Sequence, residues 1–363
     1  MAVTGRIPAW TTAAPLLALA VLAATWGRHL PALVAAVVGV VLAGAVLAAV
    51  HHAEMVALRV GEPLGSLVLA VAVTVIEVGL IVTLTASGGP GSASLARDTV
   101  FAAVMITCNG ILGLCLLVGA VRYGLAVFNA EGSGASLGTV ATLAGVCLVL
   151  PTFTTAVPGP QFSPGQLAFA ALASLLLYGA FVSAQTVRHR DFFLPVAADG
   201  SPEEDAHAAP PSASATRWSV ALLAVALVAV VGLAKVLSPT VEDGVAAAGL
   251  PPSFVGVVIA LLVLLPETLA AVNAARRGRV QVSLNLAFGS AMASIGLTIP
   301  AVALASVWLD GPLVLGLGAT QTVLLALTVV VGALTVVPGR ATRLHGAVHL
   351  VLFAAFVFLA ANP

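Results

Sequence analysis

Apolar residues occur along this chain in long runs, each bounded by charges, prolines or glycines. A helix rises 1.5 Å per residue, so about 20 apolar residues cross roughly 30 Å of hydrocarbon. Lipid offers no hydrogen-bond partners to an open backbone, so each run is predicted to be helical. The eleven predicted spans are 10–27, 31–50, 64–86, 98–121, 134–157, 165–187, 217–237, 254–275, 281–306, 312–336 and 343–361. The pattern predicts an all-α polytopic membrane protein.

Composition supports a lipid environment. Hydrophobic residues make up 60% of the chain and charged residues 8%, whereas soluble domains carry about 25% charged residues. The zero net charge disfavours nucleic acid as a partner and leaves the bilayer as the expected surrounding. Cys108, Cys115 and Cys147 lie in apolar runs without metal-ligand spacing, so they are interpreted as packing residues. Further spans follow the first apolar run, which favours an uncleaved helix over a signal peptide.

The positions of arginine and lysine orient the spans, because cytoplasmic loops of membrane proteins are enriched in both. With a cytoplasmic N-terminus, eleven basic residues face the cytoplasm and three face the other side. The cytoplasmic group is Arg6, Arg59, Arg122, Arg188, Arg190, Arg217, Arg276, Arg277, Arg279, Arg340 and Arg343, and the other group is Arg28, Arg97 and Lys235. This bias would collapse if one interior span were miscounted. It predicts a periplasmic or external C-terminus.

A polar segment rich in acids and prolines divides the chain at 189–216 and is predicted to be a mobile cytoplasmic linker. It separates an N-terminal extra helix (1–30) and a first repeat (31–188) from a second repeat (217–363). Each repeat holds five predicted spans. An odd number gives the two repeats opposite orientations, as in inverted-repeat transporters.

Two acids lie deep within apolar spans, whereas the other twelve lie in predicted loops, at span ends or in the linker. Glu77 and Glu267 each follow the start of their span by about 12 residues, which corresponds to ~18 Å and the middle of the bilayer. A charge at this depth costs at least ~2.5–3.5 kcal/mol. No lysine or arginine lies at this depth, so a bound proton would keep each acid neutral. A packing role is the alternative, but ionisable groups inside membranes are generally functional.

Residues beside the two acids suit a cation site. Thr74 lies one helical turn before Glu77 and can offer a ligand oxygen. Pro266 precedes Glu267 and removes a backbone hydrogen bond to Leu262, which predicts a helix break beside the acid. Broken helices supply backbone oxygens to ions in transporters, although an ordinary kink is the alternative.

The span that follows each acid is predicted to complete the site. Asn109 in the first repeat and Ser290 in the second are the preferred ligands, because amide and hydroxyl oxygens suit hard cations. Gly289 and Asn285 are candidates for shaping the site. Close helix packing without a ligand role is the alternative for each of these residues.

The histidines are weaker candidates. His349 lies within the last span and is either a proton relay or a core histidine. His51 and His52 follow the second predicted span and are expected to be solvated.

The stretches RVGEPLGSLVLAVAVTVIEVGLI and LLPETLAAVNAARRGRVQVSLNLAFGSAMASIGLTIP resemble the bacterial ChaA-type calcium/proton antiporters of the cation/calcium exchanger superfamily. The resemblance covers nearly the whole chain. It implies eleven spans, inverted repeats, the bacterial inner membrane, and exchange of cytoplasmic Ca²⁺ for external protons. Some relatives also move Na⁺ or K⁺. The superfamily's GNxxE-like motif has its glutamate at Glu77 and Glu267, although Val73–Thr74 and Val263–Leu264 replace Gly–Asn.

The predicted function is therefore cation/proton antiport, with Glu77 and Glu267 as metal- and proton-binding groups and no cofactor. A Na⁺ or K⁺/H⁺ antiporter that uses the same acids is the nearest alternative. An intramembrane enzyme would need motifs such as HExxH, which the sequence lacks. A channel would conduct ions without proton coupling.

Overall fold

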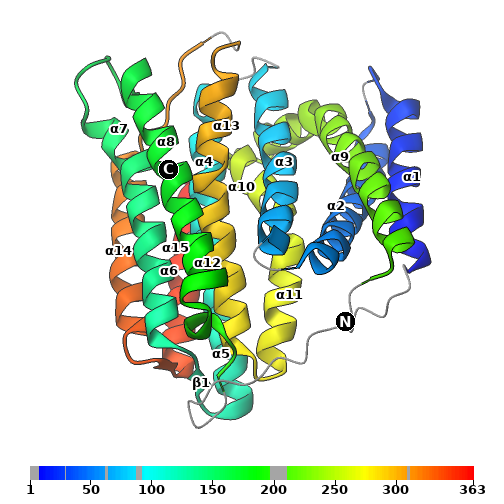
Figure 1. Ribbon diagram of the computed structural model, residues 1–363. Coiled ribbons are helices and arrows are strands. Elements are labelled where there is room, and N and C mark those ends of the chain that lie inside the picture. Colours follow the sequence, from blue (N-terminus) through cyan, green and yellow to red (C-terminus); the bar gives the residue numbers. More distant parts are fainter. Residues whose placement is uncertain (1–7, 29, 62–63, 87–91, 197–210, 309–310) are drawn as a thin grey trace. The chain divides into compact units, whose positions relative to one another are not determined.

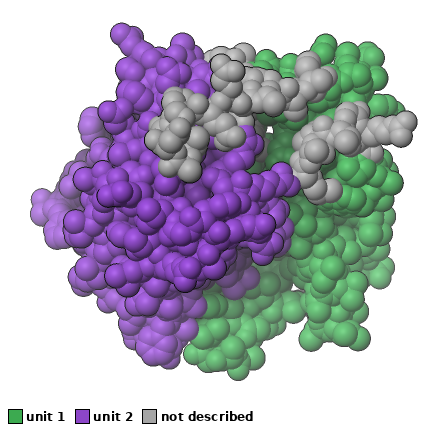
Figure 2. Space-filling model, turned by 90° about the horizontal axis from the view of Figure 1, so that it is seen from below, with its two compact units in different colours: residues 1–92, 206–255 green, residues 93–205, 256–363 purple. Residues whose placement is uncertain are grey.

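The computed structural model describes residues 8–28, 30–61, 64–86, 92–196, 211–308 and 311–363, which are mostly helical (Figure 1). Predicted and observed helices can therefore be compared over these ranges. The chain forms two compact units, which are coloured separately in Figure 2. The first unit contains residues 1–92 and 206–255, and the second contains residues 93–205 and 256–363. Each unit thus takes segments from both predicted repeats.

The described residues of the first unit form α1 (Ala9–Thr25), α2 (Ala32–Val60), α3 (Leu64–Ala86) and α9 (Ala213–Ala247). Helix α9 packs against α1, α2 and α3, and α2 packs against α1 and α3. Glycines permit the close approach of α9 to its neighbours. A Cβ on Gly232 would lie 2.5 Å from a methyl group of Leu22, and one on Gly79 would lie 2.5 Å from a methyl group of Val231.

Helix α2 continues to Val60, beyond the predicted end at residue 50, and this extension changes the environment of the histidine pair. The side chain of His52 is fully buried. Its Nε2 lies 2.9 Å from the carbonyl oxygen of Thr11, and its Nδ1 lies 3.3 Å from Oγ of Ser219. The expectation that His52 is solvated is wrong, because α1 and α9 cover this part of α2.

The second unit contains the remaining elements. Its first part comprises α4 (Leu95–Met105), the π-helical turn η2 (Ile106–Ile111), α5 (Leu112–Tyr123), β1 (Ala126–Val127), α6 (Ala130–Ala144), η3 (Gly145–Val149), α7 (Leu150–Phe153), α8 (Pro164–Ser183), η4 (Ala184–Arg188) and η5 (Arg190–Phe193). Its second part comprises most of α10 (Phe254–Val263), then α11 (Leu265–Arg276), α12 (Val280–Gly296), α13 (Thr298–Ala305), α14 (Ala319–Val336), β2 (Arg340–Ala341) and α15 (Arg343–Ala361). The short strands β1 and β2 pair antiparallel.

The span formed by η1 (Ser92–Ser94), α4, η2 and α5 is the core of the second unit. In the most apolar 18-residue stretch of this span 83% is buried, whereas in the corresponding stretch of α15 17% is buried. Helices α5 and α15 cross closely at two glycines, Gly113 and Gly346. A Cβ on Gly346 would lie 2.7 Å from the backbone nitrogen of Leu117 and 2.8 Å from the carbonyl oxygen of Gly113. The backbones therefore approach as they do where small residues line membrane helices.

Eight helices among the described residues are long and apolar enough to cross a membrane, and the bent pair α10–α11 would make nine. Two shorter apolar helices are Ala9–Thr25 and Val71–Thr83. The polytopic helical class is thus confirmed, while the count of eleven spans and the inverted repeats stay predictions.

Predicted boundaries also differ from the structure around α14 and α9. Residues 312–318, which were predicted to begin a span, are not helical. Gly316 and Leu317 donate backbone hydrogen bonds to the carbonyl oxygens of Pro160 and Leu148, so other segments of the unit satisfy this backbone. Helix α9 begins at Ala213, inside the predicted linker, and residues 197–210 of that linker lie outside the described residues.

Candidate functional site

Glu77 lies in the middle of the unbroken helix α3, in the first unit. Its side chain is 2% exposed, and Thr74, one turn earlier, is 7% exposed. Val71 and Val75 on the same helix are each 44% exposed. The carboxyl group therefore lies on the covered face of an apolar helix. A carboxylate in such surroundings is costly unless it is paired, protonated or bound to a cation.

Glu267 lies in the second unit, directly after a break in the backbone. Helices α10 and α11 meet at Leu264 with a bend of 54°. The nitrogen of Leu264 still donates to Ala260, and its carbonyl accepts from the nitrogen of Thr268. Pro266 is buried in the first turn of α11, and its missing N–H interrupts the helical bonds. The predicted break beside this acid is confirmed.

The break gives the two acids different electrostatic surroundings. Glu267 belongs to the first turn of α11. The N-terminus of a helix carries partial positive charge, which stabilises a nearby carboxylate by about 0.3–1 kcal/mol and in partly buried sites by up to ~2 kcal/mol. Glu77 is far from either end of α3 and receives no such contribution. The first turn of α11 therefore offers partial positive charge to Glu267 that the middle of α3 does not offer to Glu77.

Helix α12 packs against α11 and carries three of the predicted site residues. Ser283 donates to the carbonyl oxygen of Ala271, one turn after Glu267, at 2.7 Å. Ser290 and Gly289 are half-buried, and no described atom lies within 4 Å of a Cβ built on Gly289. Space beside Gly289 is compatible with a bound ion or water, and the ligand role of Ser290 stays a prediction.

Asn285 faces a different part of the second unit. Its Nδ2 donates to the carbonyl oxygen of Phe193 at 2.6 Å, and its Oδ1 accepts from Gln281 at 2.8 Å. Phe193 is buried, with its ring edge against Phe181. Asn285 thus attaches the segment after α8 to α12, and its predicted contribution to the cation site stays a prediction.

Asn109 and His349 were predicted as separate candidates, and the structure brings them together. Asn109 lies in the π-helical turn η2, and its Oδ1 is 3.0 Å from Nδ1 of His349. Both side chains are fully buried. The Nδ2 of Asn109 donates to Thr328 on α14 at 2.9 Å. The amide of Asn109 is therefore occupied by α14 and α15.

Comparison with known proteins identifies the family of this chain. The pattern of the family described as sodium/calcium exchanger protein matches residues 9–187 and 218–362. The chain belongs to this family.

Relatives of this exchanger cover nearly its full length. It is 46% identical to y4hA of Sinorhizobium fredii over 99% of this chain and 98% of that protein. It is 36% identical to the sodium-potassium/proton antiporter ChaA of Escherichia coli over 94% of this chain and 93% of that protein. The resemblance to ChaA-type proteins is therefore confirmed.

Solved structures share the fold at low sequence identity. Native YfkE has a TM-score of 0.69 and 17% identity over 97% of this chain and all of its own. The H⁺/Ca²⁺ exchanger CAX has a TM-score of 0.72 and 15% identity over 96% of this chain and 86% of its own.

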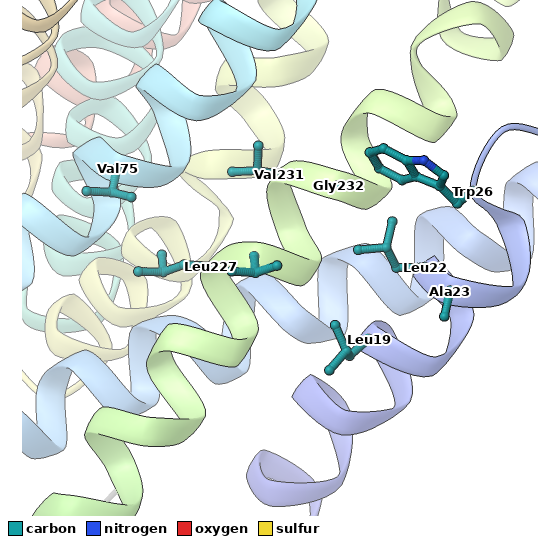
Figure 3. Close-up of a pocket in the computed structure, with 9 residues that line it drawn as sticks. Leu19, Leu22, Ala23, Trp26, Val75, Leu227, Val231 and Gly232 are labelled. Atoms are coloured by element: carbon teal, nitrogen blue, oxygen red, sulfur yellow. The ribbon is translucent and has the colours of Figure 1, made fainter.

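A separate groove lies in the first unit of the exchanger, between α1, α3 and α9 (Figure 3). Its volume is about 640 Å³, and its lining is apolar: Leu19, Leu22, Ala23, Trp26, Val75, Leu227, Val228, Val231 and Gly232. Lys235 lies near its edge, with Nζ 5.5 Å from the ring centre of Trp26. A groove lined by carbon offers no oxygen ligands, so it is no candidate for holding a cation.

Sequence reasoning missed Thr328 and Thr335, which bond to Asn109 and His349 respectively. Their spacing in the sequence could have identified them, because polar residues seven apart lie on one face of an apolar helix, here α14.

Replacing Pro266 with alanine tests the importance of the break. Alanine restores the N–H that can bond to Leu262, so the bend should decrease and Glu267 should leave the helix start. We expect cation-driven proton movement to fall between about tenfold and 100-fold, because small misplacements of reacting groups have effects of this size. Exchange assays in vesicles measure the change. Pro300→Ala, in α13, is the matched control. Equal activity of Pro266→Ala and wild type would contradict a role for the break.

Proposed function

We propose that this exchanger is a secondary antiporter that exports Ca²⁺ from the cytoplasm in exchange for protons. Glu77 and Glu267 bind the cation and the proton in turn. The observation that carries the proposal is the carboxyl group of Glu77, which is 2% exposed in the middle of an apolar helix. The proposal assigns no enzymatic activity and no cofactor, because the transported ions are its substrates.

The chemistry follows from the cost of burying charge. Ionised carboxylates suit Ca²⁺, which takes six to eight oxygen ligands. When protons replace the metal, the carboxyl groups become neutral and burial becomes inexpensive. The costly state is an ionised carboxylate with no bound metal, because several kcal/mol of desolvation is then uncompensated. Avoidance of this state would couple the two ions rather than allow a leak.

Ca²⁺ is favoured by the solved structures with this fold, which include YfkE, described as a Ca²⁺/H⁺ antiporter, and the H⁺/Ca²⁺ exchanger CAX. A second candidate is Na⁺ or K⁺/H⁺ exchange, which is supported by the name of the 36%-identical relative ChaA. One carboxylate would balance the charge of a monovalent ion, whereas Ca²⁺ requires two.

The proposal places the chain in the bacterial inner membrane with its N-terminus in the cytoplasm. The eleven-to-three distribution of basic residues supports this orientation. The exported cation would then enter its binding site from the cytoplasmic side.

Proton movement in inside-out vesicles tests the function. Vesicles with an acidic interior, which corresponds to the external side, would be challenged in turn with Ca²⁺, Na⁺ and K⁺ while a pH-sensitive dye reports the gradient. We expect Ca²⁺ to collapse the gradient, and vesicles without the protein to show no response. A response to Na⁺ or K⁺ alone would replace the calcium assignment with the second candidate. Ion flux without proton movement would indicate a channel and overturn the proposal.

A further inference from the structure

The apolar groove of the first unit has a basic end. Its walls include Val228 of α9, which is 62% exposed, and Val75 of α3. At one end the ring of Trp26 turns from the end of α1 toward α9 (Figure 3), where Nζ of Lys235 lies over it at 5.5 Å. This cation–π contact positions the ammonium group without neutralising it. Arg28 is exposed two residues after Trp26, so the apolar walls lead to two basic side chains.

The positive charge at this end is not compensated by the protein. Among the described side chains, no carboxylate forms an ion pair with Lys235 or Arg28. The nearest acids along α9 are Glu242 and Asp243, which follow Lys235 by about 10 Å of helix. Glu242 already accepts a hydrogen bond from Ser238 at 2.7 Å. The basic end is therefore available to an anion from outside the chain.

The depth of the groove matches one leaflet of a bilayer. On α1 the lining begins at Leu19, seven residues before Trp26, and on α9 it begins at Leu227, eight residues before Lys235. At 1.5 Å per residue, the apolar lining extends about 10–12 Å from the basic end. Half of the hydrocarbon layer is about 15 Å thick. An acyl chain of one leaflet would follow this course from the membrane surface toward its centre.

The residues at the basic end suit a membrane surface. Tryptophan is enriched at the membrane–water interface, and lysine extends its ammonium group to the headgroups while its carbon chain stays in apolar surroundings. Arg28 and Lys235 also belong to the three basic residues that are predicted to face the external side. Lipid tails can fill any apolar groove, so selection of a lipid depends on the basic end. An anionic phosphate is attracted there, whereas a zwitterionic headgroup also brings positive charge.

We propose that the groove binds one anionic phospholipid, with its phosphate at Lys235 and Arg28 and an acyl chain between α1, α3 and α9. The volume of about 640 Å³ lies within the range of roughly 300–1,000 Å³ that is typical of small-molecule sites. The bound chain would contact Val75, two residues before Glu77, and so support the helix that carries this acid. The site requires a membrane but no particular transported ion, so it is independent of the proposed function.

Lys235 is the one lysine of the chain, so it can report binding by itself. Reductive methylation with ¹³C-formaldehyde labels lysine and the terminal amine and keeps the charge. The full-length protein in neutral detergent would be titrated with phosphatidylglycerol and, separately, with zwitterionic phosphatidylcholine. We expect the Lys235 methyl signal, identified by its loss in Lys235→Gln, to shift and saturate with phosphatidylglycerol alone. No shift, or equal shifts with both lipids, would overturn the proposal.

Inorganic phosphate separates a lipid site from a site for a soluble anion. It offers the same charged group without an acyl chain, so at equal concentration we expect it to leave the Lys235 signal unchanged. A shift as large as that with phosphatidylglycerol would assign the basic end to a soluble anion and overturn the lipid assignment.

Substitutions at the two parts of the groove test whether both contribute. Native mass spectrometry would count bound phosphatidylglycerol and measure its affinity. We expect Lys235→Gln to lower the affinity about fivefold, the effect of one lysine near a membrane surface. Val228→Trp keeps the basic end but fills the groove, and should lower the affinity by a similar factor. Arg343→Gln removes an exposed positive charge at the start of α15, outside the groove, and should bind as wild type does.

Wild-type affinity in both Lys235→Gln and Val228→Trp, each folded, would overturn the proposal. The same spectra show the number of protein chains in each complex. A dimer that Val228→Trp dissociates would assign the groove to a second copy of the chain, and this result would also overturn the lipid assignment.

Discussion

Replacing Glu77 with glutamine is expected to lower cation-driven proton movement by ~100-fold or more. Glutamine has nearly the shape of glutamate but carries neither the charge that binds metal nor the exchangeable proton. Removing one charge from a buried pair of opposite charges costs about 3–5 kcal/mol, and ~2.8 kcal/mol corresponds to a 100-fold loss of affinity. The same loss is expected for Glu267→Gln. Dye-reported proton movement in vesicles measures both.

The fold should tolerate these substitutions, because a neutral amide is less costly in the membrane than a carboxylate. Glu242→Gln on α9 is the matched control, since it makes the same chemical change in the unit that contains Glu77. It should exchange ions at the wild-type rate. Wild-type exchange by both Glu77→Gln and Glu267→Gln would show that the cation and the proton bind elsewhere.

Replacing Gly346 with valine is expected to destabilise the protein strongly. A Cβ at this position meets the backbone of Leu117 and Gly113, at 2.7 and 2.8 Å, so no side-chain rotation can relieve the overlap. Ordinary overpacking costs about 1–3 kcal/mol, and overlap with the backbone should exceed that range. The temperature of unfolding in detergent and the yield of folded protein measure the effect.

Gly138→Val provides the comparison for Gly346→Val. Gly138 lies within α6, and no described atom lies within 4 Å of a Cβ built on it. The same increase in side-chain size should therefore leave the unfolding temperature close to that of wild type. If Gly346→Val were as stable as Gly138→Val, the close crossing of α5 and α15 would be wrong.

Much of the helical pattern could be predicted because lipid imposes it. Helix α3 (Leu64–Ala86) and helix α15 (Arg343–Ala361) have the predicted limits, since charges or prolines flank their apolar runs. The ends of α2 and α9 could not be predicted in this way. Both helices continue past the apolar run, and α2 does so because α1 and α9 cover its polar end.

Part of the candidate site could also be predicted. Both acids and the break at Pro266 follow from the local sequence, because the free-energy cost of burying an acid and the bend at a proline are each properties of a single helix. The partners of Asn109 could not be found locally: Thr328 and His349 are 219 and 240 residues away along the chain. Only packing of α14 and α15 against η2 brings these side chains together.

Each of the two units contains segments from before and after the linker, so a cut in the linker would divide both units. A cut between residues 196 and 211 would leave α1, α2 and α3 on one fragment and α9 on the other. Neither fragment would then contain a complete unit, because each unit draws on both sides of the cut. Helix α9 fits against α1, α2 and α3 through contacts that need no peptide link. Each fragment would therefore need the other to complete both units.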